Sequence, residues 1–529
     1  MKTHARRILA AIALATSTLT AGTPVAVTTY HNDNQRTGWN SNETILTPAS
    51  VASGNFARLF SHNLDGQAYA QPLYVPNVTV NGAVHNVVFV ATENDSVYAF
   101  DADSNAGANA APLWQAKFAD PVHAITPVPR ADTGTNNITP RIGITSTPVI
   151  DLGSQTIYVV AKTKETVGRT IEYVQRLHAL DITTGAERPG SPVVIVATYP
   201  GTCGLSDGHN VTFNALLGNQ RSALLLNDGM VYIAWASHGD GGPYSGWVMA
   251  YDAATLQQMA VLDTVPDATG FCAGGIWNSG SGPAADAAGN VFFTTANGLF
   301  NANNGGRNYG NSIVKATPSL IPADFFTPFD QYFLNAFDID LGSGGVLLLP
   351  TQAGPYPDLL VQAGKEGTLY VVNRDSMGGY NLFDNSQIVQ SINGALGSVF
   401  SAPVYANGAV YFSGSQDNIK AFAVTNGELS TTPATTAQVF AHPGPGMSVS
   451  SAPDGSNAIL WALDAQGWTT GAASVLYALD AGTLAVLYSS HRKSRDAAGP
   501  SIRFNIPTVA NGKVYVGTAN SLVVYGALH

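Results

Sequence analysis

Residues 86–105 read NVVFVATENDSVYAFDADSN, and residues 112–115 read PLWQ. An apolar strand ends here in a turn of small and polar residues, a second strand closes on Asp-Ala, and a further strand follows another turn. Weaker copies of this unit recur to the end of the chain, near residues 157–185, 231–255, 290–319, 359–379, 409–428, 459–484 and 513–526. The recurrence of one short β-unit predicts a ring or stack of similar sheets.

About eight units recur at a period of roughly 45–80 residues, which predicts an all-β fold with a single eight-bladed β-propeller of four-stranded antiparallel blades. A seven-bladed ring is the alternative. The last unit stops at Gly526, about two strands into its blade, whereas residues 56–64 form a strand with no unit of its own. We expect these two segments to pair, because closure removes the open sheet edge. Pro before several units, as in STPVID at 146–151, fits an innermost edge strand.

The N-terminus has the pattern of an export signal. Lys2, Arg6 and Arg7 precede an apolar stretch and then small residues, which predicts a signal peptide over residues 1–22 and a propeller domain over residues 23–529. The apolar stretch is shorter than the ~20 residues of a membrane helix, so we expect no membrane span. These features predict a secreted or periplasmic protein.

Charge and cysteine content exclude some classes of partner. The formal net charge is −11, and Lys and Arg are not clustered, so we expect no nucleic-acid partner. Cys203 and Cys272 both lie in Gly-rich loops of a chain predicted to be exported, which favours a disulfide between them. Two free thiols are the alternative, and the spacing is not that of a cysteine metal site.

One region resembles a known family. TAN at 295–297, FDID at 337–340 and AGKEGTLYVVNR at 363–374 resemble, in the same order, segments of the quinoprotein alcohol dehydrogenases. The turn VYAFDAD followed by LWQ is similar to the tryptophan-docking repeat of that family. The resemblance implies an eight-bladed propeller that uses pyrroloquinoline quinone with a bound Ca²⁺ or lanthanide, and so a metal-binding oxidoreductase.

The resemblance also implies roles for individual residues. Asn297 would bind the metal and lie at the cofactor, Asp338 would be the catalytic base and a metal ligand, and Asp340 would be a further metal ligand. Lys365 would lie beside the quinone oxygens and stabilise charge that develops there. Oxygen ligands suit a hard cation, and a carboxylate can take the alcohol proton as hydride leaves carbon.

Three features of the family are altered or absent in this chain. The position that aligns with the family's metal-binding Glu is Gly241, so Asp240 beside it is the predicted substitute ligand. The Trp on which the quinone would stack is replaced by glycines, and Trp277 is the nearby aromatic residue predicted to contact the cofactor. The family's vicinal Cys-Cys pair is absent. No Cys-x-x-Cys-His haem motif occurs, so an enzyme of this kind would need a separate electron acceptor.

Two other functions are considered. A non-catalytic propeller would bind a carbohydrate, small-molecule or protein partner at its loop face. A lyase or hydrolase would need an acid–base pair such as His238 with Asp240 or Tyr244 in one cleft. The dehydrogenase hypothesis predicts that the site residues converge at the axis of the ring.

Overall fold

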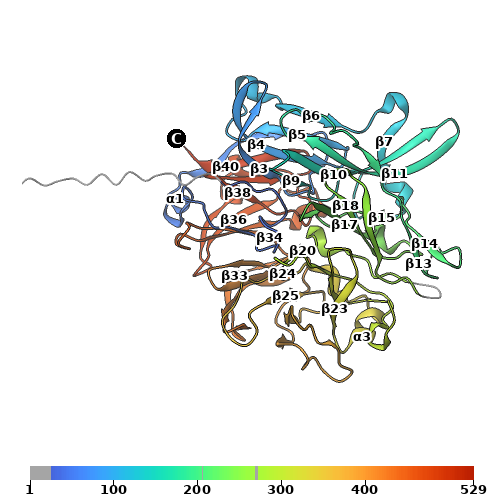
Figure 1. The fold of residues 1–529 in the computed structure, drawn as a ribbon. Coiled ribbons are helices and arrows are strands. Elements are labelled where there is room, and N and C mark those ends of the chain that lie inside the picture. Colours follow the sequence, from blue (N-terminus) through green and yellow to red (C-terminus); the bar gives the residue numbers. More distant parts are fainter. Residues whose placement is uncertain (1–24, 205, 268–271, 529) are drawn as a thin grey trace, which may run out of the picture.

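The computed structural model describes residues 25–204, 206–267 and 272–528. The predicted signal peptide lies outside the described residues. Within them, the main β-sheets follow one another around a central axis in chain order, from blue to red in Figure 1. The predicted eight-bladed β-propeller is therefore confirmed. No helix among the described residues is long and apolar enough to cross a membrane.

The first four blades contain the following strands. Blade 1 has β3 (Leu73–Val80), β4 (Ala83–Thr92), β5 (Ser96–Asp101) and β6 (Trp114–Lys117). Blade 2 has β9 (Val149–Asp151), β10 (Thr156–Val167), β11 (Thr170–Asp181) and β12 (Val193–Val194), with β7 (Ile125–Pro129) and β8 (Arg141–Ile142) added. Blade 3 has β16 (Leu225–Asn227), β17 (Met230–Ser237), β18 (Trp247–Asp252) and β19 (Gln258–Asp263), with β15 (Gly218–Asn219) added. Blade 4 has β20 (Ala284–Ala285), β21 (Val291–Thr294), β22 (Ile313–Ala316) and β23 (Pro322–Thr327), with β27 (Gly379–Tyr380) added.

The second four blades complete the ring. Blade 5 has β24 (Leu347–Leu348), β25 (Leu359–Ala363), β26 (Leu369–Asn373) and β28 (Gln390–Ile392). Blade 6 has β29 (Val404–Ala406), β30 (Ala409–Ser413), β31 (Asp417–Thr425) and β33 (Ala434–Phe440), with β32 (Glu428–Leu429) added. Blade 7 has β34 (Gly446–Ser450), β35 (Ile459–Asp464), β36 (Val475–Asp480) and β37 (Val486–Ser489), with β1 (Trp39–Asn40) added. Blade 8 has β38 (Thr508–Ala510), β39 (Lys513–Gly517), β40 (Ser521–Ala527) and β2 (Phe56–Asn63).

Other elements lie outside the blade sheets. The strands β13 (Thr198–Pro200) and β14 (Asn210–Thr212) form a separate antiparallel hairpin. The α-helices of the described residues are short: α1 (Pro48–Ala52), α2 (Arg130–Thr133) and α3 (Gln331–Ala336). Short 3-10 turns, among them η3 (His238–Asp240), η4 (Asn278–Gly280) and η6 (Leu341–Ser343), stand near the ends of strands.

Turn chemistry fixes the first hairpin of several blades. Asn81-Gly82, Asp228-Gly229, Asn407-Gly408 and Asn511-Gly512 each have positive φ at both residues. Two successive positive φ angles make the type I′ turn, whose twist matches that of antiparallel strands. In blades 1, 3, 6 and 8, the innermost strand therefore turns straight into the second strand.

Apolar side chains fill the interfaces between neighbouring blades. Each of eight buried clusters draws its main members from two adjacent blades, and one of them joins blade 8 to blade 1. Trp114 of blade 1 packs against Phe89, and its indole N–H donates to the carbonyl of Ile182 in blade 2 (2.9 Å). A Cβ at Gly185 would lie 2.5 Å from the Trp114 ring, so this turn of blade 2 requires glycine.

The N- and C-terminal parts of the chain close the ring as predicted. The strand β2 pairs antiparallel with β40, from Phe56 opposite Ala527 to Asn63 opposite Ser521. Figure 1 shows the red strands β38 and β40 beside the blue strand β3. Blade 8 thus takes its outermost strand from the beginning of the described chain, and the circle has no open end.

Residues 27–40, here called the axial segment, run along the inner edge of the ring and hydrogen-bond to the innermost strand of every blade. Backbone bonds reach Tyr74, Ile150, Ala285, Leu348, Tyr405 and Val449. Side-chain bonds from Asn34 and Asn40 reach the carbonyls of Leu226 (2.8 Å) and Val509 (2.9 Å). Tyr30 packs in one buried cluster with Ala223, Ala402 and Ile506, from blades 3, 6 and 8. The axial segment therefore connects all eight blades along the inner edge of the ring.

Candidate active site

Four residues that the sequence singled out lie in contact at one site. The Lys365 ammonium is 2.5 Å from Oδ2 of Asp340 and 3.1 Å from Oδ1 of Asp338. The Asn297 amide N–H₂ donates to Oδ1 of Asp338 (2.9 Å), and the Asn297 backbone N–H donates to Oδ1 of Asp340 (3.0 Å). One cation and two carboxylates thus share a single hydrogen-bonded cluster, built from segments of blades 4 and 5.

Local structure holds this cluster in place. Asn297 lies in the turn after β21, and its Oδ1 accepts a hydrogen bond from Asn311 (3.0 Å). Asp338 and Asp340 connect α3 to η6, and Asn335 of α3 accepts the N–H of Gly298 (2.7 Å). Lys365 follows β25, whose end therefore carries the cation to the two carboxylates.

The two aspartates differ in exposure. The Asp338 side chain is 72% exposed, whereas that of Asp340 is 10% exposed. Burial raises the pKa of the Asp340 carboxyl above its usual value, against the opposing effect of Lys365. Burial also acts to lower the pKa of Lys365, but the Asp340 and Asp338 carboxylates outweigh it and raise this pKa. Lys365 is therefore a charged group held between two acids.

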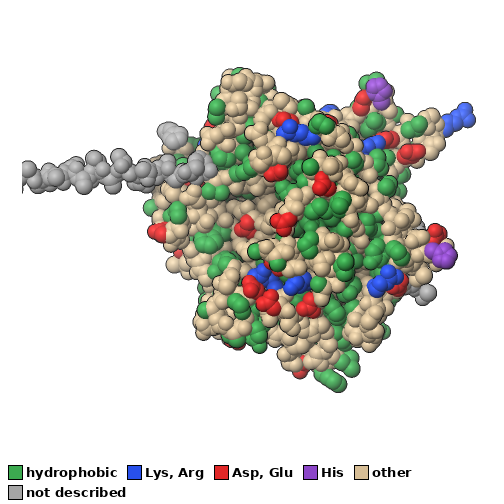
Figure 2. Space-filling model, viewed as in Figure 1, with side chains coloured by type: hydrophobic (Ala, Val, Ile, Leu, Met, Phe, Trp, Pro, Cys, Tyr) green, Lys and Arg blue, Asp and Glu red, His purple; other side chains and the backbone are tan. Residues whose placement is uncertain are grey.

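Asp340 and Lys365 also line a cavity of about 220 Å³ at the axis of the ring. The other lining residues come from several blades: Asn137, Asn219, Arg221, Asp240, Trp277, Ser279, Ser343, Phe400, Arg503 and Phe504. Figure 2 shows acidic and basic side chains close together near the middle of a face that is mostly uncharged. Trp277 and Asp240 therefore share one cavity with Lys365 and Asp340, whereas Asp338 is outside its lining.

Sequence reasoning missed several of the lining residues. Arg221, Ser279, Ser343, Phe400 and Phe504 each stand four or five positions before the innermost strand of their blade. A ring brings equivalent positions of its repeats to the same level around the axis. Aligning the repeats at their innermost strands is therefore the signal that would have found them.

The predicted acid–base alternative is not assembled. The Nε2 atom of His238 faces the Lys162 ammonium (2.8 Å) in the protein interior, and burial holds the pKa of His238 well below its usual value. The Tyr244 hydroxyl instead donates to Oδ1 of Asp240 (2.9 Å). His238 therefore does not line the cavity that contains Asp240.

An ammonium group lies among the predicted metal ligands. Asn297, Asp338 and Asp340 offer the oxygen atoms that a hard cation prefers, but Lys365 already lies between the two carboxylates. Asp240 contributes its carboxylate to the cavity and is bound by Tyr244. Among the described residues there is no group of three or more His, Cys, Asp or Glu side chains that could hold a metal ion. This arrangement does not fit a metal unless Lys365 moves away.

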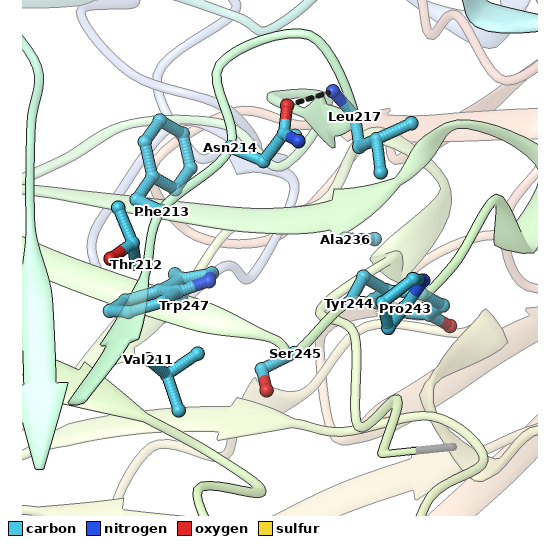
Figure 3. Close-up of a pocket in the computed structure, with 11 residues that line it drawn as sticks. Val211, Thr212, Phe213, Asn214, Leu217, Ala236, Pro243, Tyr244, Ser245 and Trp247 are labelled. Carbon is cyan, nitrogen blue, oxygen red and sulfur yellow. Dashed lines mark hydrogen bonds between the residues drawn. The ribbon is translucent and has the colours of Figure 1, made fainter. Parts of the chain in front are cut away.

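A second cavity lies beside blade 3 and holds about 20 Å³ (Figure 3). Phe213, Trp247 and Pro243 are among its lining residues, and the Asn214 side chain accepts the N–H of Leu217 next to it (3.0 Å). A space of this size holds about one water molecule. It is therefore not a ligand site.

Cys203 and Cys272 form a disulfide in the structure, with their Cα atoms 6.0 Å apart. Cys203 lies between β13 and β14, and Cys272 follows β19. The bond therefore ties the extra hairpin to the segment that leads from blade 3 to blade 4.

Comparison with known proteins shows a shared fold. No family model matches the chain, and no curated protein matches it in sequence. A quinohemoprotein alcohol dehydrogenase from Pseudomonas putida HK5 has a TM-score of 0.62 and 15% identity, and one from Comamonas testosteroni has 0.61 and 15%; each alignment covers 95% of this chain and 80% of that one. A europium-containing methanol dehydrogenase has a TM-score of 0.60 and 14% identity, over 96% of this chain and 98% of that one.

Proposed function

We propose that this protein is an exported dehydrogenase that binds pyrroloquinoline quinone in the axial cavity and oxidises an alcohol or a sugar. The observation that carries the proposal is the convergence of Trp277, Asp340 and Lys365 on one cavity, from positions 88 residues apart in the chain. The fold shared with quinoprotein dehydrogenases supports it.

The residues that line the cavity suit a flat, acidic cofactor. The partly exposed ring of Trp277 offers an aromatic face, and stacking on such a face stabilises a planar ligand. Lys365 supplies a cation beside it, and a fixed positive charge stabilises negative charge that develops on a bound ligand. When bound, the quinone would supply the hydride acceptor, which none of the twenty side chains provides.

The two aspartates have different roles in the proposed reaction. Asp338, with its side chain largely in solvent, is the predicted base that takes the proton of the substrate hydroxyl. Asp340 is buried against Lys365 and holds the ammonium at the cavity wall. Lys365 would hold Asp338 in position, because its Nζ contacts the Asp338 carboxylate (3.1 Å) and also donates to the Asp338 carbonyl (3.0 Å).

Binding of the cofactor is the first test. Purified protein would be titrated with pyrroloquinoline quinone, with and without Ca²⁺ or La³⁺, while absorbance and melting temperature are recorded. We expect a saturable rise in melting temperature, because a ligand that binds only the folded state stabilises it. The absence of any saturable change in either signal would overturn the proposal.

Substitution at Lys365 tests the site. Lys365→Gln should weaken quinone binding on the order of tenfold or more, because a charge-assisted contact is lost. Lys493→Gln, at an exposed position of blade 7, is the matched control and should bind as the parent does. Asp338→Asn should abolish turnover with an artificial electron acceptor and leave quinone binding intact. Full turnover in this variant would exclude Asp338 as the base.

A further inference from the structure

Two arginines form one wall of the axial cavity, far from each other in sequence. The Arg221 guanidinium donates from Nη2 to the carbonyl of Arg503 (3.2 Å), and Arg503 donates to the Asn137 side chain (3.1 Å). Arg221 stands before the innermost strand of blade 3, and Arg503 before that of blade 8. Both therefore enter the cavity at the level of the other lining residues.

Aromatic rings hold both guanidinium groups. The ring of Phe504 lies 4.7 Å from Cζ of Arg221 and 5.2 Å from Cζ of Arg503. Tyr69 packs on Arg221 at 4.9 Å, and Trp468 packs on Arg503 at 4.0 Å. A guanidinium stacked between rings keeps its plane and its donor fork fixed. The N–H donors of both guanidinium groups are therefore preorganised for a ligand.

Within the described parts of the chain, no ion pair joins either guanidinium to a carboxylate, and Glu93 acts on Arg221 only from beyond ion-pair distance. Arg221 is only 5% exposed, and the Nε atoms of both arginines are buried without a hydrogen-bond partner. Burial lowers the pKa of Arg221 to about 10, although nearby Tyr69 opposes the shift. A buried cation without a partner is costly, and the cost is removed when an anion pairs with it.

The nearby carboxyl groups are bonded to other residues, although Oε1 of Glu93 is buried without a hydrogen-bond partner. The Oε2 atom of Glu93 accepts the N–H of Gly143 (2.7 Å) and the hydroxyl of Thr145 (3.1 Å). Asp340 pairs with Lys365 and Asp240 is bound by Tyr244. The guanidinium groups of Arg221 and Arg503 are therefore available to pair with an anionic ligand.

We infer that Arg221 and Arg503 form an anion subsite, which binds a carboxylate or phosphoryl group of the ligand that occupies the axial cavity. The planar fork of arginine matches two oxygens of such a group with paired N–H donors. This inference goes beyond the proposed dehydrogenase activity, since the subsite would select an acidic ligand whatever reaction follows.

The test uses small anions and no quinone, so that its result is independent of the proposed activity. The melting temperature of the full-length mature protein would be followed against millimolar inorganic phosphate in one series and oxalate in another. Ionic strength would be held constant with chloride, because sulfate-like salts stabilise proteins without binding at high concentration. We expect a saturable rise of about 2–3 °C at a hundredfold excess over Kd in at least one series.

Substitutions of the two arginines test whether the anion binds at the proposed subsite. Arg503→Gln and Arg221→Gln should lose the saturable rise, and Arg503→Lys should retain only part of it, because lysine keeps the charge and lacks the fork. Arg169→Gln, in the exposed turn between β10 and β11, is the matched control and should respond as the parent does. If Arg221→Gln fails to fold, Arg503→Gln decides the outcome. A parent that shows no saturable response, or an unchanged response in Arg503→Gln, would overturn the subsite. A response to phosphate alone identifies a phosphoryl ligand, and a response to oxalate alone identifies a carboxylate.

Discussion

Asp263, the last residue of β19, is a fully buried carboxyl group. Its Oδ1 accepts the N–H of Val265 (2.9 Å), and burial raises its pKa to about 7. Between about pH 4 and pH 7, the folded protein holds a proton here that the unfolded chain has released. Because the folded state then binds more protons, this residue makes stability fall as the pH rises through that window.

Asp263→Asn removes this titration and keeps the acceptor for Val265. The free energy of unfolding of the variant, relative to the parent, should rise by on the order of 3 kcal/mol between pH 4 and pH 8. Chemical denaturation at a series of pH values measures it. Asp228→Asn, in an exposed turn that asparagine tolerates, is the control. Parallel curves for Asp263→Asn and the parent would show that Asp263 is ionised in the folded protein.

The site residues show what sequence can and cannot reveal. Asn297, Asp338, Asp340 and Lys365 stand in local motifs, so their contact was predictable once the ring was predicted. The difference in exposure between Asp338 and Asp340 could not be predicted, because it depends on how the chain turns from α3 into η6. Arg221 and Arg503 belong to no motif, and only the closed ring brings them together.

Among the elements, the axial segment depends on Arg36. This side chain is fully buried and donates hydrogen bonds to Thr29 Oγ1 (2.7 Å) and to the carbonyls of Tyr30 (2.9 Å), Leu224 (3.1 Å) and Pro283 (2.9 Å). It thereby joins the axial segment to blades 3 and 4. Losing these donors leaves four acceptors without partners in the interior.

Arg36→Met should therefore lower the free energy of unfolding by on the order of 4 kcal/mol or more. Denaturant titration of the purified variant measures the loss, and Arg36→Lys should recover part of it. Arg169→Met provides the comparison at an exposed position. Equal stability of Arg36→Met and Arg169→Met would mean that the axial segment does not need this arginine.

The strands themselves were largely predictable, since apolar runs and Asn-Gly or Asp-Gly turns mark them directly. The long hairpin of β10 and β11 was only partly predicted, because the charged residues at its exposed end are typical of a loop. The short helix α3 was also missed, since a six-residue helix has too few turns to show a period.

At the scale of the whole molecule, the seam between β2 and β40 determines closure. Asn63 and Ser521 face each other across this pair and are not part of the core. Asn63→Cys combined with Ser521→Cys should form a disulfide that raises the free energy of unfolding by about 3–5 kcal/mol, because it closes nearly the whole chain into a loop. Unfolding in oxidising and reducing buffer, with each single variant and the parent alongside, separates this bond from the native one. No gain on oxidation would show that covalent closure of this seam does not stabilise the ring.

The axial segment has a consequence for the order of events in the cell. Asn40 of this segment binds the carbonyl of Val509, which lies 469 residues later in the chain and is therefore made long after it. Until the last blade is made, the axial segment lacks part of its hydrogen-bond partners. We therefore expect the ring to gain its full set of central contacts only when blade 8 has been made.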